Sequence, residues 1–309
     1  SLLFPNFSMK PFISVIITAY NRAQYVNEAI NSVLNQTLNR DKYEILIVTN
    51  MNLQEREGVK IIKSNERNLG AMIAKGILSS EGEIISLLDD DDLFLPNKLE
   101  VVYKVFNKYD ISLFHNEMYF TDENGNIIER LEKNREKAVR KYVREEPVSY
   151  TFLRKNLIDK IKLSFNASSL SFRKDALINY LDYLKGIIHQ SIETVIFFLV
   201  AYKNNIIISP QKLTYYRVHS SNTSKVYMDD KINKKIIGYS FEQYPIIRKL
   251  REVNEFFKII DYDYYLYLRI FEDEEHSTSF VKALESALGL MKEDFRSAIR
   301  RYTLIRNFI

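Results

Sequence analysis

Four consecutive aspartates, at positions 89 to 92, are the residues of this sequence best suited to chemistry. They directly follow the apolar run of residues 84–88, which has the length and composition of a strand buried on both faces. Adjacent carboxylates raise one another's pKa unless a cation lies among them, so a divalent metal ion would stabilise the cluster. The alternative is an acidic loop before a helix that starts near Pro96, where negative charge is favourable. The cluster alone leaves both interpretations open.

Polar side chains also accompany the ends of two other predicted strands. The first strand, over residues 12–18, is followed closely by a polar turn, and a second strand over residues 44–48 is followed by another. The side chains concerned are Thr18, Tyr20, Asn21 and Arg22 in the first case and Thr49 and Asn50 in the second. The chain therefore places three separate polar segments at three strand ends.

The elements that must position these residues alternate between strands and helices. We predict strands over residues 12–18, 44–48, 59–63, 84–88 and 111–114, and helices over residues 26–34, 70–80 and 96–109. This order favours an α/β fold with a mainly parallel sheet covered by helices on both faces. Ligands bind beyond the carboxyl ends of the strands in such sheets. The three polar segments are therefore expected to meet at one edge of the sheet.

The second half of the chain has a different pattern. Asn124 and Gly125 predict the tight turn of a hairpin over residues 118–128, and the mixed charges of residues 129–146 predict a solvated helix rather than a nucleic-acid patch. Further strands are expected over residues 167–172, 206–208 and 213–218, with a buried helix over residues 192–202. From residue 229 onward the pattern is helical. We therefore predict an α/β domain over residues 9–225 and a helical appendage over residues 226–309.

Composition narrows the class of protein. The 309 residues are 46% hydrophobic, which is enough for a sizeable core. The 44 basic and 40 acidic side chains give a net charge of +4 that is spread along the chain, so no nucleic acid is expected as a partner. The absence of cysteine excludes disulfides and a cysteine nucleophile. With neither a signal-peptide pattern nor an apolar run of roughly 18 residues, we expect a cytoplasmic protein, with Met9 as a candidate native start.

Five segments, taken together, resemble the GT-A glycosyltransferases of family 2, which are inverting enzymes that use nucleotide-diphosphate sugars. The segments cover residues 14–22, 44–48, 68–70, 82–92 and 216–219 and read SVIITAYNR, EILIV, NLG, GEIISLLDDDD and YRVH. Their order and spacing match the family between residue 12 and about residue 220. The resemblance implies a GT-A domain, followed here by helices, that transfers a sugar to an acceptor hydroxyl with metal assistance.

The resemblance also implies which residues form the site. The positions expected against the nucleotide are Thr18, Tyr20, Asn21, Arg22, Asn50, Asn68, Asp89 and Asp90. The D-x-D motif of the family matches Asp89 and Asp91, and Asp91 is expected to bind Mn²⁺ or Mg²⁺ together with the late His219. Outside this context, a lone histidine after a strand is more often a surface residue. One departure concerns Thr49 and Asn50, which replace an acidic pair and offer no charged acceptor to the base and ribose.

An inverting transfer needs a general base, a carboxylate that takes the proton of the acceptor hydroxyl. The family supplies it from an acidic pair that opens a helix, and here the helix opens with Ile192 and Glu193. Glu193 matches the second acid, while Ile192 replaces the first. The resemblance therefore assigns the base to Glu193, with Asp175 or Asp182 as the next candidates. Without the resemblance, Glu193 could equally be an acid favoured by the helix dipole in a first turn.

The C-terminal residues 292–308 predict an amphipathic helix, with Phe295, Ile299, Tyr302 and Ile305 on one face and many basic side chains beside them. We expect this helix to pack on the catalytic domain or to form a homodimer contact. The alternative is peripheral binding to the inner face of an anionic membrane, which would bring the enzyme to a lipid-linked acceptor. The expected partners are thus a nucleotide-diphosphate sugar donor and a glycan or lipid-linked acceptor.

Two other functions compete with sugar transfer. A degenerate GT-A domain that binds nucleotide or glycan without catalysis is favoured by the departures at Asn50 and Ile192. A phosphotransferase with an aspartyl nucleophile would need a positioned lysine and further acids, which the spacing does not place. Release of nucleoside diphosphate from a panel of nucleotide sugars would distinguish a transferase from a binding domain.

Overall fold

The structure, a computed structural model, describes residues 10–155, 157–188, 191–219, 234–270, 280–293 and 295. Within these residues nine strands form one sheet, in the order β3-β2-β1-β4-β8-β6-β9-β5, with β7 paired to β9. The strands are β1 (Ile13–Ala19), β2 (Tyr43–Thr49), β3 (Val59–Lys63), β4 (Ile84–Asp89), β5 (Leu93–Phe94), β6 (Leu113–Thr121), β7 (Val148–Ser149), β8 (Leu170–Arg173) and β9 (Asn205–Arg217).

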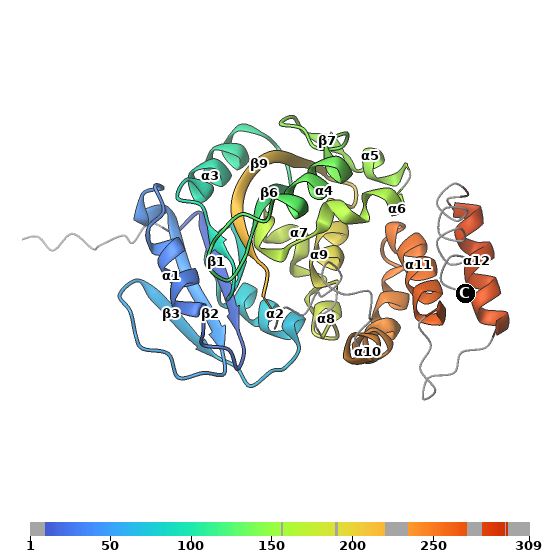
Figure 1. Ribbon diagram of the computed structural model, residues 1–309, viewed down its shortest axis with the longest axis horizontal. Coiled ribbons are helices and arrows are strands. Elements are labelled where there is room, and N and C mark those ends of the chain that lie inside the picture. Colours follow the sequence, from blue (N-terminus) through green and yellow to red (C-terminus); the bar gives the residue numbers. More distant parts are fainter. Residues whose placement is uncertain are drawn as a thin grey trace, which may run out of the picture.

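Helices lie on both faces of the sheet, and a further group lies to one side of it (Figure 1). The helices in the first group are α1 (Val26–Leu34), α2 (Leu69–Ser79), α3 (Lys98–Lys108), α4 (Glu129–Val139), α5 (Tyr150–Arg154), α6 (Leu157–Lys160), α7 (Asp175–Ile178), α8 (Leu181–Leu184) and α9 (Ile192–Ala201). The second group is α10 (Lys234–Leu250), α11 (Phe256–Ile270) and α12 (Phe280–Glu293). Three short 3-10 turns are η1 (Arg40–Lys42), η2 (Ile161–Ser164) and η3 (Ala167–Ser169).

The centre of the sheet is parallel, which confirms the α/β class predicted from the alternating elements. Strand β1 pairs in parallel with β2 on one side and with β4 on the other, and β2 pairs in parallel with β3. Strand β8 runs antiparallel to β4 and to β6. These central strands are buried on both faces, so their apolar sequence is continuous rather than alternating.

Two apolar layers hold the helices to the sheet. On one face, Ile13, Val15 and Ile17 of β1 belong to the same cluster as the buried sides of α1 and α3. On the other face, Ile16 packs with α2 and α9. Successive side chains of a strand point to opposite faces, and this alternation explains how one strand contributes to both layers. The sheet is thereby fixed between helices, and its strand ends are held at constant positions.

The strand predicted over residues 167–172 is correct only in its second part. Residues 167–169 form the turn η3, and β8 begins at Leu170. Asn166 has a φ of 76°, and its side-chain oxygen accepts a hydrogen bond from the Ser168 amide at 3.0 Å. Such a side-chain cap offers the backbone an alternative to the strand ladder. The turn matters for the site because Ser168 lies beside the aspartate cluster.

Three other predictions for the second half differ from the structure. The hairpin is shorter than predicted: its turn at Gly125 has a φ of 84°, and Thr121 at the end of β6 forms an isolated antiparallel bridge with Ile127, but its second arm is no full strand and α4 begins at Glu129. The two strands predicted over residues 206–208 and 213–218 are one strand, β9, which runs parallel to β6 and takes up extra residues at two register shifts opposite residues 115–118 of β6. The helix predicted over residues 129–146 ends at Val139 and is not fully solvated, because Arg135 is buried.

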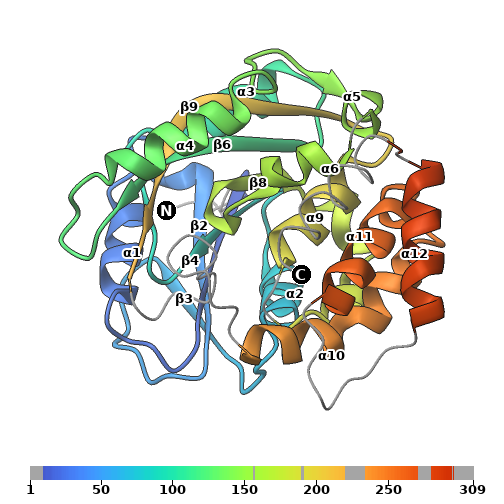
Figure 2. The same cartoon turned by 45° about the vertical axis from the view of Figure 1, so that its right-hand side comes forward.

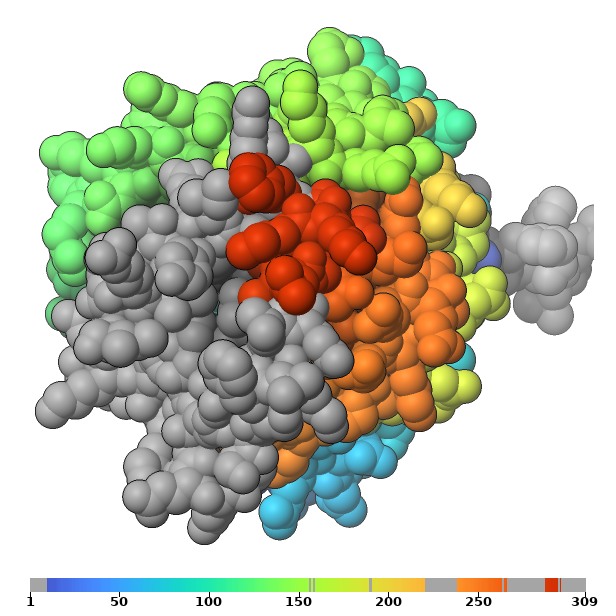
Figure 3. Space-filling model, turned by 90° about the vertical axis from the view of Figure 1, so that its right-hand side faces the viewer, coloured from blue at the N-terminus to red at the C-terminus, as the bar shows by residue number. Residues whose placement is uncertain are grey.

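The C-terminal helices share the core of the α/β part. Phe256 of α11 contacts Phe198 of α9 edge to face, with 5.4 Å between the ring centroids. The side chain of Asn254 donates a hydrogen bond to the carbonyl of Phe198 at 2.9 Å. Figure 2 shows α11 beside α9, and Figure 3 shows the outer surface of α10–α12 in orange and red.

Among the described helices, none combines the length and the apolar character needed to cross a membrane. The amphipathic helix predicted over residues 292–308 lies outside the described residues, apart from residues 292, 293 and 295. Its packing, dimer and membrane alternatives stay predictions.

Candidate functional site

The carboxyl ends of the central strands bring the predicted site segments together. In the sheet register, Thr18 lies beside Val48 of β2 on one side and Asp89 of β4 on the other. Asn21 and Asn50 follow the ends of β1 and β2. The three polar segments therefore meet at one edge of the sheet, where the topology predicts a ligand site.

The aspartate cluster forms a tight turn after β4. The Asp92 amide donates to the Asp89 carbonyl at 3.2 Å, and the Asp89 amide donates to the Ser168 hydroxyl at 3.0 Å. Asp89 is half-buried, whereas Asp91 and Asp92 are buried. One carboxylate oxygen from each of these three residues lies within 4.8 Å of the others. The turn therefore gathers three carboxyl groups into one small volume.

Desolvation and mutual repulsion disfavour charge in this cluster. Burial, followed by the charges of Asp91, Asp90 and Glu193, raises the pKa of Asp89 to about 8. Burial raises the pKa of Asp90 to about 6, although a hydrogen bond from Arg22 opposes the rise. The pKa of Asp92 is raised well above its usual value by burial and by Asp91 and Asp89. These shifts favour the protonated carboxyl groups, and a bound cation would oppose them.

Two cationic or basic side chains already touch the cluster. The guanidinium of Arg22 bonds to Asp90 and lies 2.8 Å from Asp91 Oδ2. Nε2 of His219 lies 2.9 Å from the same oxygen, and His219 is buried against the ring of Tyr25. The structure thus brings Arg22, Asp90, Asp91 and His219 together, although the sequence separates them by up to almost 200 positions.

The turns after β1 and β2 are joined by a reciprocal amide pair. The Asn21 amide donates to the side-chain oxygen of Asn50 at 3.0 Å, and the Asn50 side chain donates back to that of Asn21 at 2.5 Å. Asn21 has a left-handed φ of 54°, a conformation that asparagine tolerates better than most residues. In the segment before Asn21, Thr18 is buried and Tyr20 is half-buried. The turns after β1 and β2 therefore offer neutral amides rather than carboxylates.

Asn68 makes a different contact from the one expected. Its side chain donates to the carbonyl of Lys185 at 3.1 Å, while the amides of Leu69 and Gly70 donate to the carbonyls of Ile188 and Ile187 at 2.7 and 3.0 Å. The first amides of α2 are thus used to hold residues 185–188, which precede α9. A role of Asn68 at the nucleotide stays a prediction.

Glu193 lies in the first turn of α9 and is half-buried. Desolvation raises its pKa to about 7, and its charge contributes to the raised pKa of Asp89, so the two carboxyls lie within electrostatic range. The alternatives are placed less favourably. Asp182 is exposed and paired with Lys185. Asp175 starts α7 directly after Lys174, whose amide donates to the Glu83 carbonyl at the opposite end of β4 from Asp89.

The residues present fit a hard divalent cation. Carboxylate oxygens are the ligands that Mg²⁺ and Mn²⁺ prefer, and Asp89, Asp91 and Asp92 supply three of them. Asp92 Oδ1 accepts a hydrogen bond from the Arg217 amide at 3.1 Å, whereas its buried Oδ2 has no hydrogen-bond partner among the described residues. A buried carboxylate oxygen without a partner is costly, and a cation would satisfy it.

Three residues at this edge were not predicted from the sequence. Lys98 is fully buried at the start of α3, Ser168 bonds to the Asp89 amide, and the guanidinium of Arg217 pairs with Glu28 at 2.6 Å. Lysine is normally exposed, so the pattern of α3 gives no reason to place Lys98 inside. Arg217 lies in the YRVH segment, and that segment was the one available indication of its position.

Comparison with known proteins places the chain among sugar transferases. The family model for glycosyl transferase family 2 matches residues 14–181. An uncharacterized glycosyltransferase from Methanocaldococcus jannaschii is 37% identical over 153 residues, which are 44% of this chain and 52% of that protein. A similar relative from Nostoc sp. is 28% identical over 230 residues, 68% of this chain and 66% of that protein. The chain thus spans about half to two thirds of the length of these relatives.

Solved structures resemble the chain in fold. S. aureus TarS 1-349 in complex with UDP-GlcNAc is 12% identical, with a TM-score of 0.55, covering 91% of this chain and 80% of that one. The mannosyltransferase PcManGT from Pyrobaculum calidifontis, in complex with GDP-Man and Mn²⁺, is 13% identical, with a TM-score of 0.52 and coverages of 96% and 76%. At these identities the likeness establishes the GT-A type of fold alone.

Proposed function

The chain belongs to glycosyl transferase family 2, and on that premise we propose that it transfers a sugar from a nucleotide-diphosphate donor to an acceptor hydroxyl, with inversion and with the help of Mn²⁺ or Mg²⁺. The observation that carries the proposal is the placement of two desolvated acidic groups, the aspartate cluster of β4 and Glu193 of α9, within electrostatic range of each other. A transfer of this kind needs one group for the leaving diphosphate and one for the acceptor.

The donor side is formed by the turns after β1 and β2. Asn21 and Asn50 would meet the base through their amides, and Thr18 and Tyr20, which precede Asn21, would also contact the nucleotide. Arg22, now paired with Asp90 and Asp91, would bind a phosphate oxygen of the donor, since a guanidinium matches phosphate geometry. Solved proteins of the same fold hold UDP-GlcNAc or GDP-Man, which supports a nucleotide sugar as the ligand.

Asp89, Asp91 and Asp92 would hold the metal ion, with His219 beside Asp91. When bound, a divalent cation neutralises the negative charge that develops on the leaving nucleotide. The protein's own contribution is to keep three carboxylates close together at a fixed strand end. The presence of Mn²⁺ in the complex of PcManGT supports this assignment.

Glu193 would act as the general base toward the acceptor, a glycan or a lipid-linked hydroxyl. A carboxyl with a pKa of about 7 is ionised in about half of the molecules at neutral pH and is a stronger base than an exposed glutamate. Desolvation by the apolar start of α9 causes this shift, so the reactivity of Glu193 follows from its burial. The acceptor hydroxyl would lie between this carboxylate and the donor sugar.

The test is release of nucleoside diphosphate from a panel of nucleotide sugars, with Mn²⁺, with Mg²⁺ and with EDTA. We expect metal-dependent release from one donor, abolished by Asp91→Asn and retained by Asp182→Asn, a matched change at an exposed acid. Binding of that donor without release, for any acceptor or for water, would refute transfer and favour a domain that binds nucleotide without catalysis.

A further inference from the structure

Both acidic parts of the proposed site are attached to one stretch of chain, residues 162–169, which we call the connecting segment. At its C-terminal end, the hydroxyl of Ser168 accepts a hydrogen bond from the Asp89 amide at 3.0 Å. Near its start, the hydroxyl of Ser164 lies 2.8 Å from that of Thr194, the residue after Glu193. The position of this segment therefore affects the relative placement of Asp89 and Glu193.

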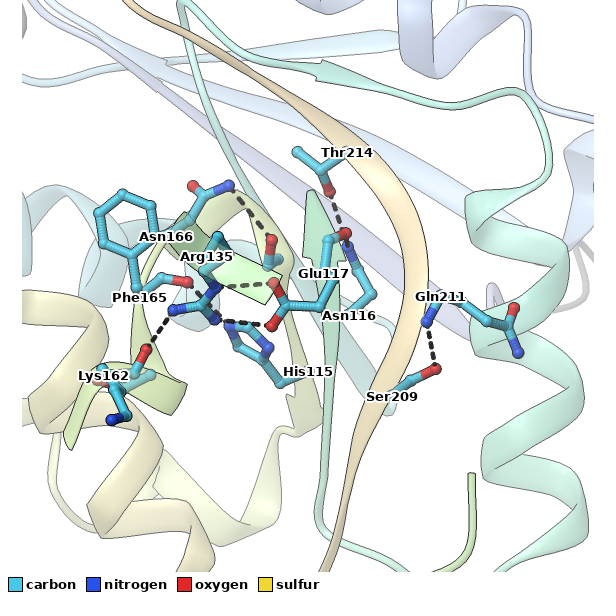
Figure 4. Close-up of polar contacts among 12 residues, drawn as sticks. His115, Asn116, Glu117, Arg135, Lys162, Phe165, Asn166, Ser209, Gln211 and Thr214 are labelled. Atoms are coloured by element: carbon cyan, nitrogen blue, oxygen red, sulfur yellow. Dashed lines mark hydrogen bonds and ion pairs between the residues drawn. The ribbon is translucent and has the colours of Figure 1, made fainter. Parts of the chain in front are cut away.

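Three buried side chains from three different elements hold carbonyls of the connecting segment. Arg135 of α4 donates to the Lys162 carbonyl at 2.6 Å, and His115 of β6 bonds to the Phe165 carbonyl at 2.9 Å. Lys98 of α3 donates to the Ser168 carbonyl. Figure 4 shows Arg135 and His115 directed at the segment that carries Lys162 and Phe165. The three donors form a row along the segment, with Lys98 nearest the aspartate cluster.

The three donors are supported by further polar contacts. Glu117 accepts two hydrogen bonds from Arg135, each of 2.7 Å, and both side chains are buried. Thr214 of β9 lies at the other end of the row, where it donates to the Ser168 carbonyl at 3.2 Å and accepts from Asn116 at 3.0 Å. Such bonds are strong in a desolvated interior, and they hold one arrangement of the segment.

Lys98 is the least expected member of this row. It is fully buried, its ammonium lies 4.1 Å from the centre of the Phe94 ring, and it also donates to the Thr214 hydroxyl at 3.3 Å. Burial lowers the pKa of Lys98 well below its ordinary value, and the charge of Asp92 opposes this shift. Burying an amino group is costly unless its hydrogen bonds compensate. The nearest acceptor for the Lys98 side chain is the Ser168 carbonyl. The free-energy cost of burying Lys98 therefore depends on the position of Ser168.

We propose that Lys98 is a positioning residue, which acts through the connecting segment to keep the aspartate cluster in its metal-binding arrangement relative to Glu193. This inference rests on the proposed metal-assisted function. A positioning role and a direct electrostatic role of Lys98 predict different effects on the affinity for the cation. The charged form of Lys98 would repel a cation bound by the three carboxylates, so its removal would by itself leave cation binding unchanged or stronger, whereas loss of positioning weakens it.

The test compares Lys98→Met with the wild-type chain in a titration with Mn²⁺ alone, followed by electron paramagnetic resonance of the free ion. We expect the variant to bind Mn²⁺ about 10 to 100 times more weakly, as for other residues that orient metal ligands. Amide hydrogen exchange over residues 162–170 should become faster, because the Ser168 carbonyl loses a donor. Lys98→Arg, which keeps a charged donor, should recover part of the affinity.

Lys160→Met is the matched control, because Lys160 is also buried and also donates to a carbonyl, that of Lys155, but outside the row. It should keep the wild-type affinity for Mn²⁺. Equal or tighter binding by Lys98→Met, or an equal loss in Lys160→Met, would overturn the inference. If Lys98→Met does not fold, Thr214→Val removes the second donor to Ser168 and decides in the same way. Failure of the wild-type chain to bind Mn²⁺ would instead refute the metal assignment itself.

Discussion

Glu193→Gln should make the protein more stable and less active at the same time. The raised pKa means that the folded state disfavours the ionised carboxylate. For an acid of this kind, the favourable contribution is fully present below the pKa of the unfolded chain and is lost as the pH rises through the folded pKa. Wild-type stability should therefore fall between about pH 4.5 and pH 7 on account of this group, and the neutral amide of glutamine should avoid that loss.

The size of the effect follows from the shift. A rise of the Glu193 pKa from 4.5 to about 7 corresponds to roughly 3 kcal/mol between low and high pH. Because the side chain is half-buried, solvent screens part of this energy, and we expect the variant to be more stable by about 2 kcal/mol at pH 8. The difference should disappear at pH 4.5, where the wild-type carboxyl is protonated in the fold.

The assay is urea denaturation of both chains in EDTA at pH 4.5 and pH 8, combined with transfer kinetics in Mn²⁺. Removal of a general base should lower the transfer rate by about 10² to 10⁴. In the wild type, the rate should rise about tenfold per pH unit below pH 7, in proportion to the ionised fraction, and Glu193→Gln should abolish that dependence. A variant that is no more stable at pH 8, or that transfers at the wild-type rate, would refute the reasoning.

Three further predictions test the site and the fold. Asp91→Asn should lose Mn²⁺ binding without destabilising the metal-free protein, because one of several crowded charges is removed; unchanged turnover would contradict the metal assignment. The metal-free wild type should lose stability from pH 4 to pH 8, since the pKa of Asp89 is raised to about 8, and Mn²⁺ should reverse the trend by binding the ionised carboxylates; a flat thermal-denaturation profile in EDTA would exclude the shift. Gly70→Ala should cost about 2 to 3 kcal/mol by chemical denaturation, because its Cβ would lie 1.8 Å from the Leu184 carbonyl, whereas Gly238→Ala, with open space in α10, should be neutral or stabilising by up to about 1 kcal/mol.

The first half of the fold could be predicted because its information is local. Apolar runs such as residues 84–88 and the helical spacing of residues 26–34 describe elements that are buried in a regular way. The convergence of Arg22, Asn50 and Asp91 also followed from the rule that parallel strands end at a common edge. In this part, the pattern of the sequence and the final packing agree.

The second half could not be predicted in the same detail, because its elements depend on contacts between distant residues. Arg135 looks like a solvated helix residue until Glu117, which lies on β6, is placed opposite it. Lys98 looks exposed until the Ser168 carbonyl and Thr214 are brought to its ammonium. Burial of such a side chain can be recognised only from its hydrogen-bond partners, and the partners of Arg135 and of Lys98 lie far from them in the chain.

The packing of α9 has a consequence for how such chains can be recombined. Nearly all of its side chains are buried, and Phe198 meets the sheet-side core while also contacting Phe256 of α11. Joining residues 9–225 to a foreign C-terminal module would leave the outer side of α9 exposed to water, and Glu193 stands in the first turn of that same helix. Exchange of the C-terminal helices for another module would therefore require compensating changes inside α9, the helix that carries Glu193 in its first turn.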